Sequence, residues 1–180
     1  MRHGAVSDAD AFDDGFRKLF EGRFPELFRY LDRLTGDPAL AADIAQESFI
    51  KLHQRGAMPE DPRAWLVSVA NNLFRDERRR SSRRLRILAR RSPDTTLADP
   101  PPSPDADLLP AERRAAVRAA LESLPERDRQ LLLLRHEGYS YRELATTLDL
   151  AETSVGTFLA RATATFRSTF EGRSRASHRG

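Results

Sequence analysis

The chain of 180 residues contains no cysteine. This absence excludes a disulfide-stapled secreted domain, a zinc site with thiolate ligands and a cysteine nucleophile. Histidine is also scarce, because only four are present and they lie far apart, at His3, His53, His136 and His178. The sequence therefore predicts neither a metal site nor another bound cofactor.

Long apolar stretches are missing as well. The longest run, Leu131 to Leu134, has four residues, whereas a membrane-spanning helix needs about 20. The first sixteen residues carry four aspartates and lack the apolar core of a secretory signal. We therefore expect a soluble, cytoplasmic protein without membrane insertion. β-Branched residues nowhere alternate over five positions, which argues against strands.

Proline is concentrated in one segment, residues 92–110. It holds six of the eleven prolines, four aspartates and no lysine or arginine. Such a composition cannot form a helix interior or a core, so it predicts an extended acidic linker. The chain is basic on both sides, with 18 basic and 14 acidic side chains before the linker and 12 and 9 after it. The other predicted segments are a flexible N-terminus at 1–11, modules at 12–91 and 111–170, and a flexible tail at 171–180.

Apolar residues in the first module recur at intervals of three and four, the period of an amphipathic helix. We expect three helices: one with a stripe from Phe16 to Leu34, kinked or restarted at Pro25; one from about Pro38 to His53; and one that follows Asp61 as N-cap. The predicted core-facing residues are Ala41, Ile44, Ala45, Ser48, Phe49 and Leu52 in the second helix and Trp65, Leu66, Val69 and Leu73 in the third.

The second module shows the same helical period, with a helix that begins after Pro125 and ends at Gly138. Residues 140–143 have the composition of a capping box, and a short turn at 149–151 separates the helix that follows from the last one. Two short helices joined by a three-residue turn form the helix-turn-helix pattern. The side chains predicted to lie inward are Val117, Ala120, Leu121, Leu124, Leu144, Ala145, Leu148, Val155, Leu159, Ala162 and Phe166.

Two polar features suggest binding surfaces. Nine of the 28 arginines lie between Arg75 and Arg91. They form either a solvated helix end or a phosphate-binding surface, and a second element of DNA-binding type in the chain favours phosphate. The second feature is one face of the second helix, formed by Asp43, Gln46, Glu47, Ile50 and Gln54. A polar helix face is usually exposed to solvent, but the apolar Ile50 in the middle of this one argues for a partner surface.

Three blocks together resemble a bacterial sigma factor of the extracytoplasmic-function (group IV) class of the sigma-70 family. The blocks, in order, are DPALAADIAQESFIKLH, DPRAWLVSVANNLFRDERRR and LPERDRQLLLLRHEGYSYRELATTLDL. The resemblance implies an all-α fold, with a sigma-2-like helical bundle and a sigma-4-like helix-turn-helix domain joined by the extended linker. It also implies a bacterial, nucleoid-associated transcription initiation factor that is not an enzyme and has no catalytic residues.

The resemblance also implies partners and contact residues. The partners are core RNA polymerase, through its β′ clamp helices and β subunit, and promoter DNA; the family usually has an anti-sigma factor too, which makes such a protein a candidate partner. The polymerase contacts would be Asp43, Gln46, Glu47 and Ile50. The −10 contacts would be Ala57, Met58, Arg63, Asn71, Asn72, Arg75, Arg78 and Arg79. The −35 contacts would be Arg142, Ser154, Thr157, Phe158, Arg161 and Arg167.

Two alternatives stand beside this interpretation. A stand-alone helix-turn-helix regulator would bind its DNA sequence stably without polymerase. An enzyme has less support, because the sequence offers no cluster of histidine, carboxylate and nucleophile at a glycine-rich turn. Phe158 is open to two roles of its own, since its ring could pack on a thymine methyl group or on a protein partner.

Overall fold

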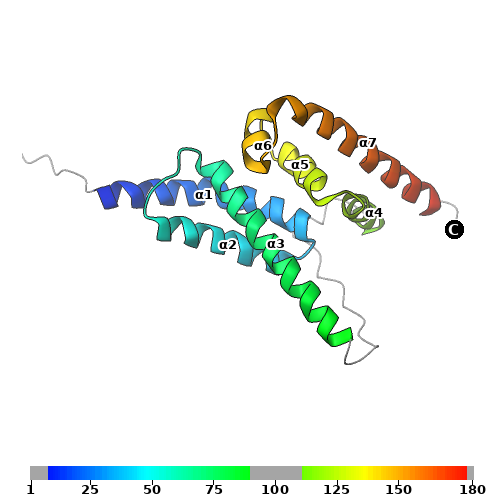
Figure 1. Ribbon diagram of the computed structural model, residues 1–180, viewed down its shortest axis with the longest axis horizontal. Coiled ribbons are helices and arrows are strands. Elements are labelled where there is room, and N and C mark those ends of the chain that lie inside the picture. The colour runs from blue at the N-terminus through cyan, green and yellow to red at the C-terminus, as the bar shows by residue number, and fades with distance from the viewer. Residues whose placement is uncertain (1–7, 90–110, 178–180) are drawn as a thin grey trace, which may run out of the picture. The chain divides into compact units, whose positions relative to one another are not determined.

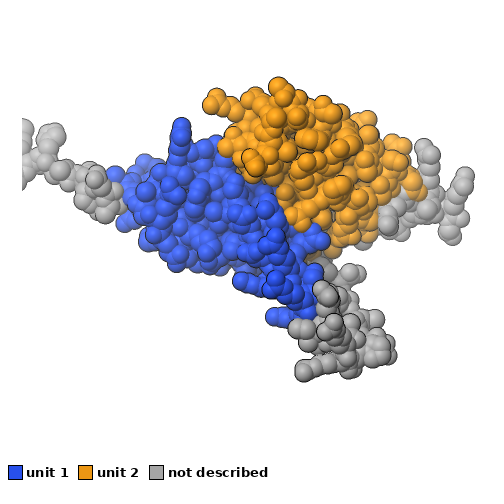
Figure 2. Space-filling model, in the orientation of Figure 1, with its two compact units in different colours: residues 1–31, 39–100 blue, residues 32–38, 101–180 orange. Residues whose placement is uncertain are grey.

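The computed structural model describes residues 8–89 and 111–177. Over these residues the chain forms seven α-helices and no strand (Figure 1). The predicted linker at 92–110 lies outside the described residues, as do the outermost residues of both predicted flexible ends. The all-α class predicted from the apolar periodicity is confirmed. The chain divides into two compact units, residues 1–31 with 39–100 and residues 32–38 with 101–180 (Figure 2).

The long first helix, α1 (Asp8–Thr35), begins before residue 12, the predicted start of the first module. It continues through Pro25 as one helix, so of the two predicted outcomes, a kink or a restart, the restart is wrong. Proline removes one backbone hydrogen bond from a helix. The turns that follow it are held by packing, because Leu27, Tyr30 and Leu31 are all buried.

The second helix, α2 (Pro38–Arg55), supplies the centre of the first unit's core. Its buried residues are the six that the apolar period predicts. Phe49 lies against three aromatic rings of α1, with its ring centroid 6.1 Å from that of Phe16, 5.0 Å from Phe20 and 6.0 Å from Phe24. Burial of one such ring stabilises the fold by about 1.5–3 kcal/mol, so this contact fixes α2 against α1.

The third helix, α3 (Pro62–Ala89), begins as predicted: the Ala64 amide donates a hydrogen bond of 2.9 Å to Asp61 Oδ1. Its core-facing stripe, however, is rotated from the predicted one. Ala64, Leu66, Val67, Ala70 and Phe74 are buried, while Trp65, Val69 and Leu73 are only half-buried. Apolar side chains cover more than one side of this helix, and the small Ala64 and Ala70 allow it to pack closely on that side.

The side chains of α3 that are described after Phe74 contribute nothing to the core. Those of residues 75–84 are exposed apart from the half-buried Glu77. Figure 1 shows this part of α3, in green, running on past α1 and α2. The first unit therefore carries an arginine-rich helical extension that is solvated along its described length.

The second unit is built around α7 (Glu152–Ser177), which packs against each of the three preceding helices. These are α4 (Ala111–Glu122), α5 (Glu126–His136) and α6 (Tyr141–Leu148). α7 continues past residue 170, the predicted end of the module. The buried residues in its core include Ala120, Leu124, Leu131, Leu134, Leu144, Val155, Leu159 and Ala162.

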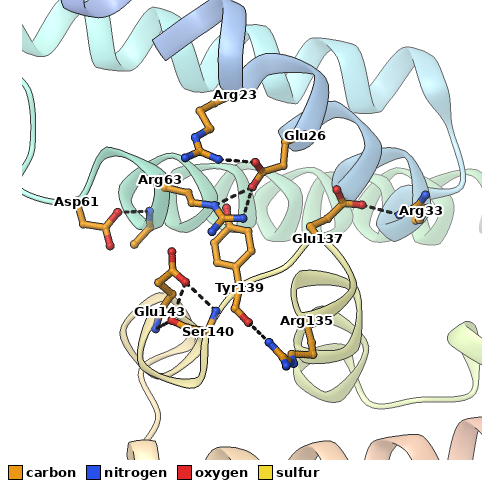
Figure 3. A network of polar contacts seen from close by, with 11 residues as sticks. Arg23, Glu26, Arg33, Asp61, Arg63, Arg135, Glu137, Tyr139, Ser140 and Glu143 are labelled. Atoms are coloured by element: carbon orange, nitrogen blue, oxygen red, sulfur yellow. Dashed lines mark hydrogen bonds and ion pairs between the residues drawn. The ribbon is translucent and has the colours of Figure 1, made fainter. Parts of the chain in front are cut away.

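The helix-turn-helix connection follows the prediction closely. The Ser140 amide donates to Glu143 Oε2 at 2.7 Å, and the Glu143 amide donates to Ser140 Oγ at 3.3 Å, which completes the capping box (Figure 3). Asp149 ends α6 in the left-handed conformation, with φ 53° and ψ 55°. Aspartate tolerates this conformation better than most residues, and α7 begins three residues later.

Candidate functional surfaces

The polar face of α2 lies on the side of the helix opposite its buried residues. Asp43 and Gln46 are exposed, and Ile50 is 47% exposed. Glu47 is half-buried and forms an ion pair of 3.2 Å with Lys51, one turn further along the helix. The four residues predicted to contact polymerase thus share one accessible strip of α2.

An apolar groove adjoins this strip, between α1 and α2. It has a volume of about 460 Å³ and is lined by Phe16, Phe20, Gln46, Phe49, Ile50, His53 and Gln54. Phe20 is 39% exposed, so it and Ile50 present apolar side chains to water side by side in one groove. Apolar surface of this kind marks protein contact sites. Sequence analysis missed Phe20 because its helical spacing places it in the core stripe.

Two polar side-chain pairs involve the first half of α1. His53 Nε2 lies 4.0 Å from Asp13 Oδ1, and its ring lies 5.2 Å from that of Phe16. Lys18 Nζ lies 2.8 Å from Asp14. Its hydrogen bond lowers the pKa of the Asp14 carboxyl and raises the pKa of the Lys18 ammonium group. Since both side chains are solvated, this pair contributes little to stability.

The loop between α2 and α3 contains the first residues predicted to contact −10 DNA. Ala57 is exposed, whereas Met58 is half-buried and its methyl group lies close to Gly15 of α1. Gly56 has a φ of +68°, the left-handed region that favours glycine, and it turns the chain out of α2. The loop is thus anchored on α1 through Met58 and presents Ala57 to solvent.

Arg63 is held within the first unit. Its Nε donates to Glu26 Oε1 at 2.8 Å, and Nη2 lies 2.8 Å from the same oxygen (Figure 3). Arg23 Nη1 donates to the other Glu26 oxygen, also at 2.8 Å. Both carboxylate oxygens are therefore engaged by guanidinium groups. This network joins the start of α3 to α1, so a DNA contact by Arg63 would have to compete with Glu26.

Asn71 and Asn72 are neighbours in sequence but lie in different environments. Asn71 is 1% exposed, and its Oδ1 accepts a hydrogen bond of 2.7 Å from the Tyr30 hydroxyl. This burial corrects the prediction for Asn71, because a side chain in the core cannot contact DNA. Asn72 is exposed and accepts from Arg75 Nη1 at 3.3 Å. A step of one residue turns the side chain by about 100° around a helix, which separates the two roles.

The remaining predicted −10 residues, Arg75, Arg78 and Arg79, are exposed on the α3 extension. The guanidinium carbon of Arg78 lies 5.8 Å from the centre of the Phe74 ring, and Arg79 lies 3.4 Å from Asp76. Three more exposed arginines, Arg80, Arg83 and Arg84, follow on the same helix. Asp76 and Glu77 are the only acidic residues among the described residues of this extension, so it carries a strong positive charge.

The residues predicted to contact −35 DNA lie on α6 and α7. Arg142, Thr157, Arg161 and Arg167 are exposed, while Ser154 and Phe158 are half-buried. Arg161 Nη2 donates to both oxygens of Asp128, at 2.9 and 3.2 Å. The guanidinium carbons of Arg127 and Arg161 lie 4.2 and 5.2 Å from the centre of the Phe158 ring. The ring thus packs within its own unit. Sequence analysis missed Arg127 and Asp128, which only tertiary packing brings to α7.

Neither a metal centre nor a membrane segment is found in the described parts of the chain. Within residues 8–89 and 111–177, no three histidine, aspartate or glutamate side chains gather closely enough to hold a metal ion. No helix in these ranges combines the length and the apolar character required to cross a bilayer.

Comparison with protein families gives two matches, to separate segments of the chain. Residues 19–84 match the family model described as Sigma-70 region 2, which covers most of α1, all of α2 and most of α3. Residues 109–165 match the model described as Sigma-70, region 4, which includes the helix-turn-helix. The first matched segment contains the polar strip of α2 and the predicted −10 residues, and the second contains the predicted −35 residues apart from Arg167.

Individual proteins are similar over most of the chain. The ECF RNA polymerase sigma factor SigL of Mycobacterium tuberculosis is 33% identical, over 77% of this chain and 79% of SigL. The probable RNA polymerase sigma factor RfaY of Xanthomonas campestris pv. campestris is 37% identical over 74% of this chain, which spans only 35% of RfaY. A solved structure of the sigma factor RpoE in complex with the anti-sigma factor NepR, from Bartonella quintana, has a TM-score of 0.68 at 19% identity. The match covers 88% of this chain and 98% of that one.

Proposed function

Because the chain belongs to the extracytoplasmic-function class of RNA polymerase sigma factors in the sigma-70 family, we propose that it initiates transcription through three separate surfaces. One surface binds core polymerase, one opens the −10 region and one recognises the −35 region. The observation that carries the proposal is the exposed apolar pair Phe20 and Ile50 beside the polar strip of α2. A protein that acts on DNA alone has no need of such a groove in a unit other than its helix-turn-helix.

Core polymerase binds the strip of Asp43, Gln46, Glu47 and Ile50 in this proposal, with the adjoining groove as part of the same interface. Apolar side chains at the centre of an interface, surrounded by polar ones, form the usual arrangement of a protein contact. The β′ clamp helices are the expected occupant. The β subunit is expected to contact the chain elsewhere.

The −10 surface consists of Ala57 and Met58 in the loop, then Asn72, Arg75, Arg78 and Arg79 along α3. Asn71 is left out because it is buried, and Arg63 joins this surface when it exchanges Glu26 for DNA. The arginines bind backbone phosphates, for which a guanidinium group is well suited. The exposed loop supplies contacts to unpaired bases, since a base displaced from the duplex needs a pocket or platform outside the helix.

The −35 surface is the exposed side of α6 and α7. Thr157 and Arg161 lie on the second helix of the helix-turn-helix, the position from which such motifs contact base edges in the major groove. Arg142 on α6 and Arg167 further along α7 are exposed, and both contact phosphates. Ser154 is half-buried and contributes at the edge of this surface.

The chain catalyses no reaction in this proposal, because RNA synthesis is carried out by the polymerase. Its place of action is the bacterial cytoplasm, at the nucleoid. An anti-sigma factor is proposed as a further partner, since RpoE of Bartonella quintana was solved in complex with one.

A direct test is copurification of the tagged chain with core RNA polymerase, followed by transcription from a promoter library with the resulting holoenzyme. We expect a stoichiometric complex that initiates at a defined promoter class. The opposite outcome is stable, sequence-specific DNA binding by the chain alone with no affinity for core polymerase. That outcome would support a stand-alone regulator and contradict the proposal.

A further inference from the structure

The first turn of α5 and the DNA-facing side of α7 meet in a cluster that the proposed contacts leave unexplained. Arg127 and Asp128 come from α5, while Phe158 and Arg161 come from α7. Asp128 and Arg161 are 33 positions apart in the sequence and are joined by hydrogen bonds. The cluster therefore exists because α5 packs against α7.

Asp128 fixes the position of Arg161. Its side chain is only 3% exposed, and both of its oxygens accept from Arg161 Nη2. A buried carboxylate requires a charged partner, so this geometry is strongly favoured. The described hydrogen bonds of Arg161 use Nη2 alone, which leaves Nε and Nη1 as donors for a ligand. The side chain of Arg161 is 55% exposed, so these donors are accessible.

Phe158 holds the guanidinium group of Arg127 beside that of Arg161. The Arg127 guanidinium carbon lies 4.2 Å from the ring centroid, close enough for a cation–π interaction. Arginine also stacks on aromatic faces through its planar group. Arg127 Nε and Nη2 each donate to Asp128 Oδ1 at 3.4 Å, at longer range than Arg161, which leaves Nη1 of Arg127 as a donor for a ligand. Two guanidinium groups thus share one carboxylate, and the cluster keeps a net positive charge.

We propose that Arg127 is a further DNA-binding residue of the −35 surface, held in place by Phe158, and that Asp128 is a positioning residue for Arg161. The ligand is the backbone phosphate of duplex DNA, whose oxygens accept charge-assisted hydrogen bonds from guanidinium groups. Phosphate contacts set the register and orientation of a protein on the duplex. The cluster accordingly orients α7 in the major groove, and Phe158 itself contacts no base. This inference rests on the proposed function of α7.

The test is the salt dependence of promoter binding by holoenzyme, measured on a promoter fragment whose start site has been mapped. Each lost phosphate contact reduces the slope of log K against log salt by about 0.9, so R127Q is expected to reduce it by about that amount. F158L is expected to weaken binding about two- to five-fold and to have little further effect in the R127Q background. R113Q, at an exposed position on α4, removes the same charge and should leave the slope unchanged.

The role of Asp128 requires a separate variant. We expect D128N to weaken promoter binding in wild type but to have little effect in the R161Q background, because the two residues act as one unit. A lower melting temperature with unchanged binding would overturn the positioning role. An R127Q slope equal to that of wild type would overturn the phosphate contact.

The wild-type titration separates this inference from the proposed function. If wild-type holoenzyme prefers the mapped promoter to one with a scrambled −35 region and R127Q matches wild type, only the present inference fails. If wild type shows no such preference, the proposed role of α7 fails and the inference fails with it.

Discussion

The α2 surface of the first unit and the α7 surface of the second present different side chains, in keeping with the different partners proposed for them. α2 presents Ile50 in the same groove as the exposed ring of Phe20, and the polar Gln46 and Gln54 also line this groove. On α7, the aromatic Phe158 is covered by arginines, and the exposed groups are hydroxyl and guanidinium. An interface of the first kind forms by removing apolar area from water, one of the second kind by neutralising phosphates and releasing counterions.

The two kinds of interface predict different salt dependences for polymerase binding and for promoter binding. Counterion release makes DNA affinity fall steeply with salt, whereas the burial of apolar area is not screened by ions. We therefore expect holoenzyme assembly to depend on salt more weakly than promoter binding does. Variants of α2 and α7 can test each side of this comparison separately.

The largest effect is expected from a charge placed in the α2 groove. I50R puts a guanidinium group where an apolar side chain is expected to be buried by polymerase. We expect the affinity for core polymerase to fall by about 2–4 kcal/mol, the range of interface hot spots, as measured by fluorescence titration. Since Ile50 is exposed in the free chain, the circular dichroism spectrum should be unchanged. A11R, at an exposed position of α1 outside the groove lining, is the control; equal affinities for the two variants would contradict the groove assignment.

Asn71 and Asn72, neighbours on α3, are expected to respond differently to truncation, because the first lies in the core and the second on the surface. N71A removes the acceptor of the Tyr30 hydroxyl in the core, so we expect it to destabilise the chain by about 1–3 kcal/mol in denaturant unfolding. N72A, at the exposed neighbour, should change stability by less than about 0.5 kcal/mol but reduce promoter opening, detected as permanganate reactivity of unpaired thymines. Full opening by N72A holoenzyme on every promoter would remove Asn72 from the −10 surface.

A smaller effect is expected from the polar strip of α2. Truncation of Gln46 and Glu47 together, in Q46A/E47A, removes polar contacts around the apolar centre of the interface. We expect core affinity to fall by about 1–2 kcal/mol, less than for I50R, because contacts around a hot spot contribute less than its centre. If this double variant weakened assembly more than I50R, polar contacts and not apolar burial would dominate the α2 surface.

The smallest effect concerns the turn that positions α7. Asp149 has a left-handed backbone, in which glycine is unstrained. We expect D149G to change stability by less than about 1 kcal/mol and D149A to lower it more than D149G does, because alanine resists a positive φ. Thermal unfolding measures both. A higher melting temperature for D149A than for D149G would show that the turn does not hold this conformation in solution.

The elements predicted best from the sequence are those with one apolar stripe and local end signals. The buried face of α2 follows from its period, and the start of α6 follows from Ser140 and Glu143, because each depends on residues a few positions apart. The buried face of α3 is harder to predict, because apolar residues cover several sides of this helix. The apolar period predicts Trp65 in the core, but its side chain is half-buried beside Arg55, whose guanidinium carbon lies 6.0 Å from the ring centre. Truncating it should therefore cost less than the 3–5 kcal/mol typical of a fully buried tryptophan.

The candidate surfaces were predicted only in part, for a similar reason. Polar residues at helical spacing identify a face, as for Asp43 to Ile50, but not which of two adjacent asparagines points inward. Contacts between distant segments leave no local signal. Glu26 with Arg63, and Asp128 with Arg161, are pairs that tertiary packing brings together. The family resemblance indicated the partners, while these pairs determine which arginines are already engaged.

The most direct test of the central claim is transcription of genomic DNA by core polymerase, with and without the chain, with mapping of transcript 5′ ends. We predict a set of starts that appears only with the chain and shares two upstream motifs at a fixed separation. I50R should abolish the whole set, while R161Q should selectively reduce starts that depend on the upstream motif. The same starts with and without the chain would contradict the claim that it directs polymerase to promoters.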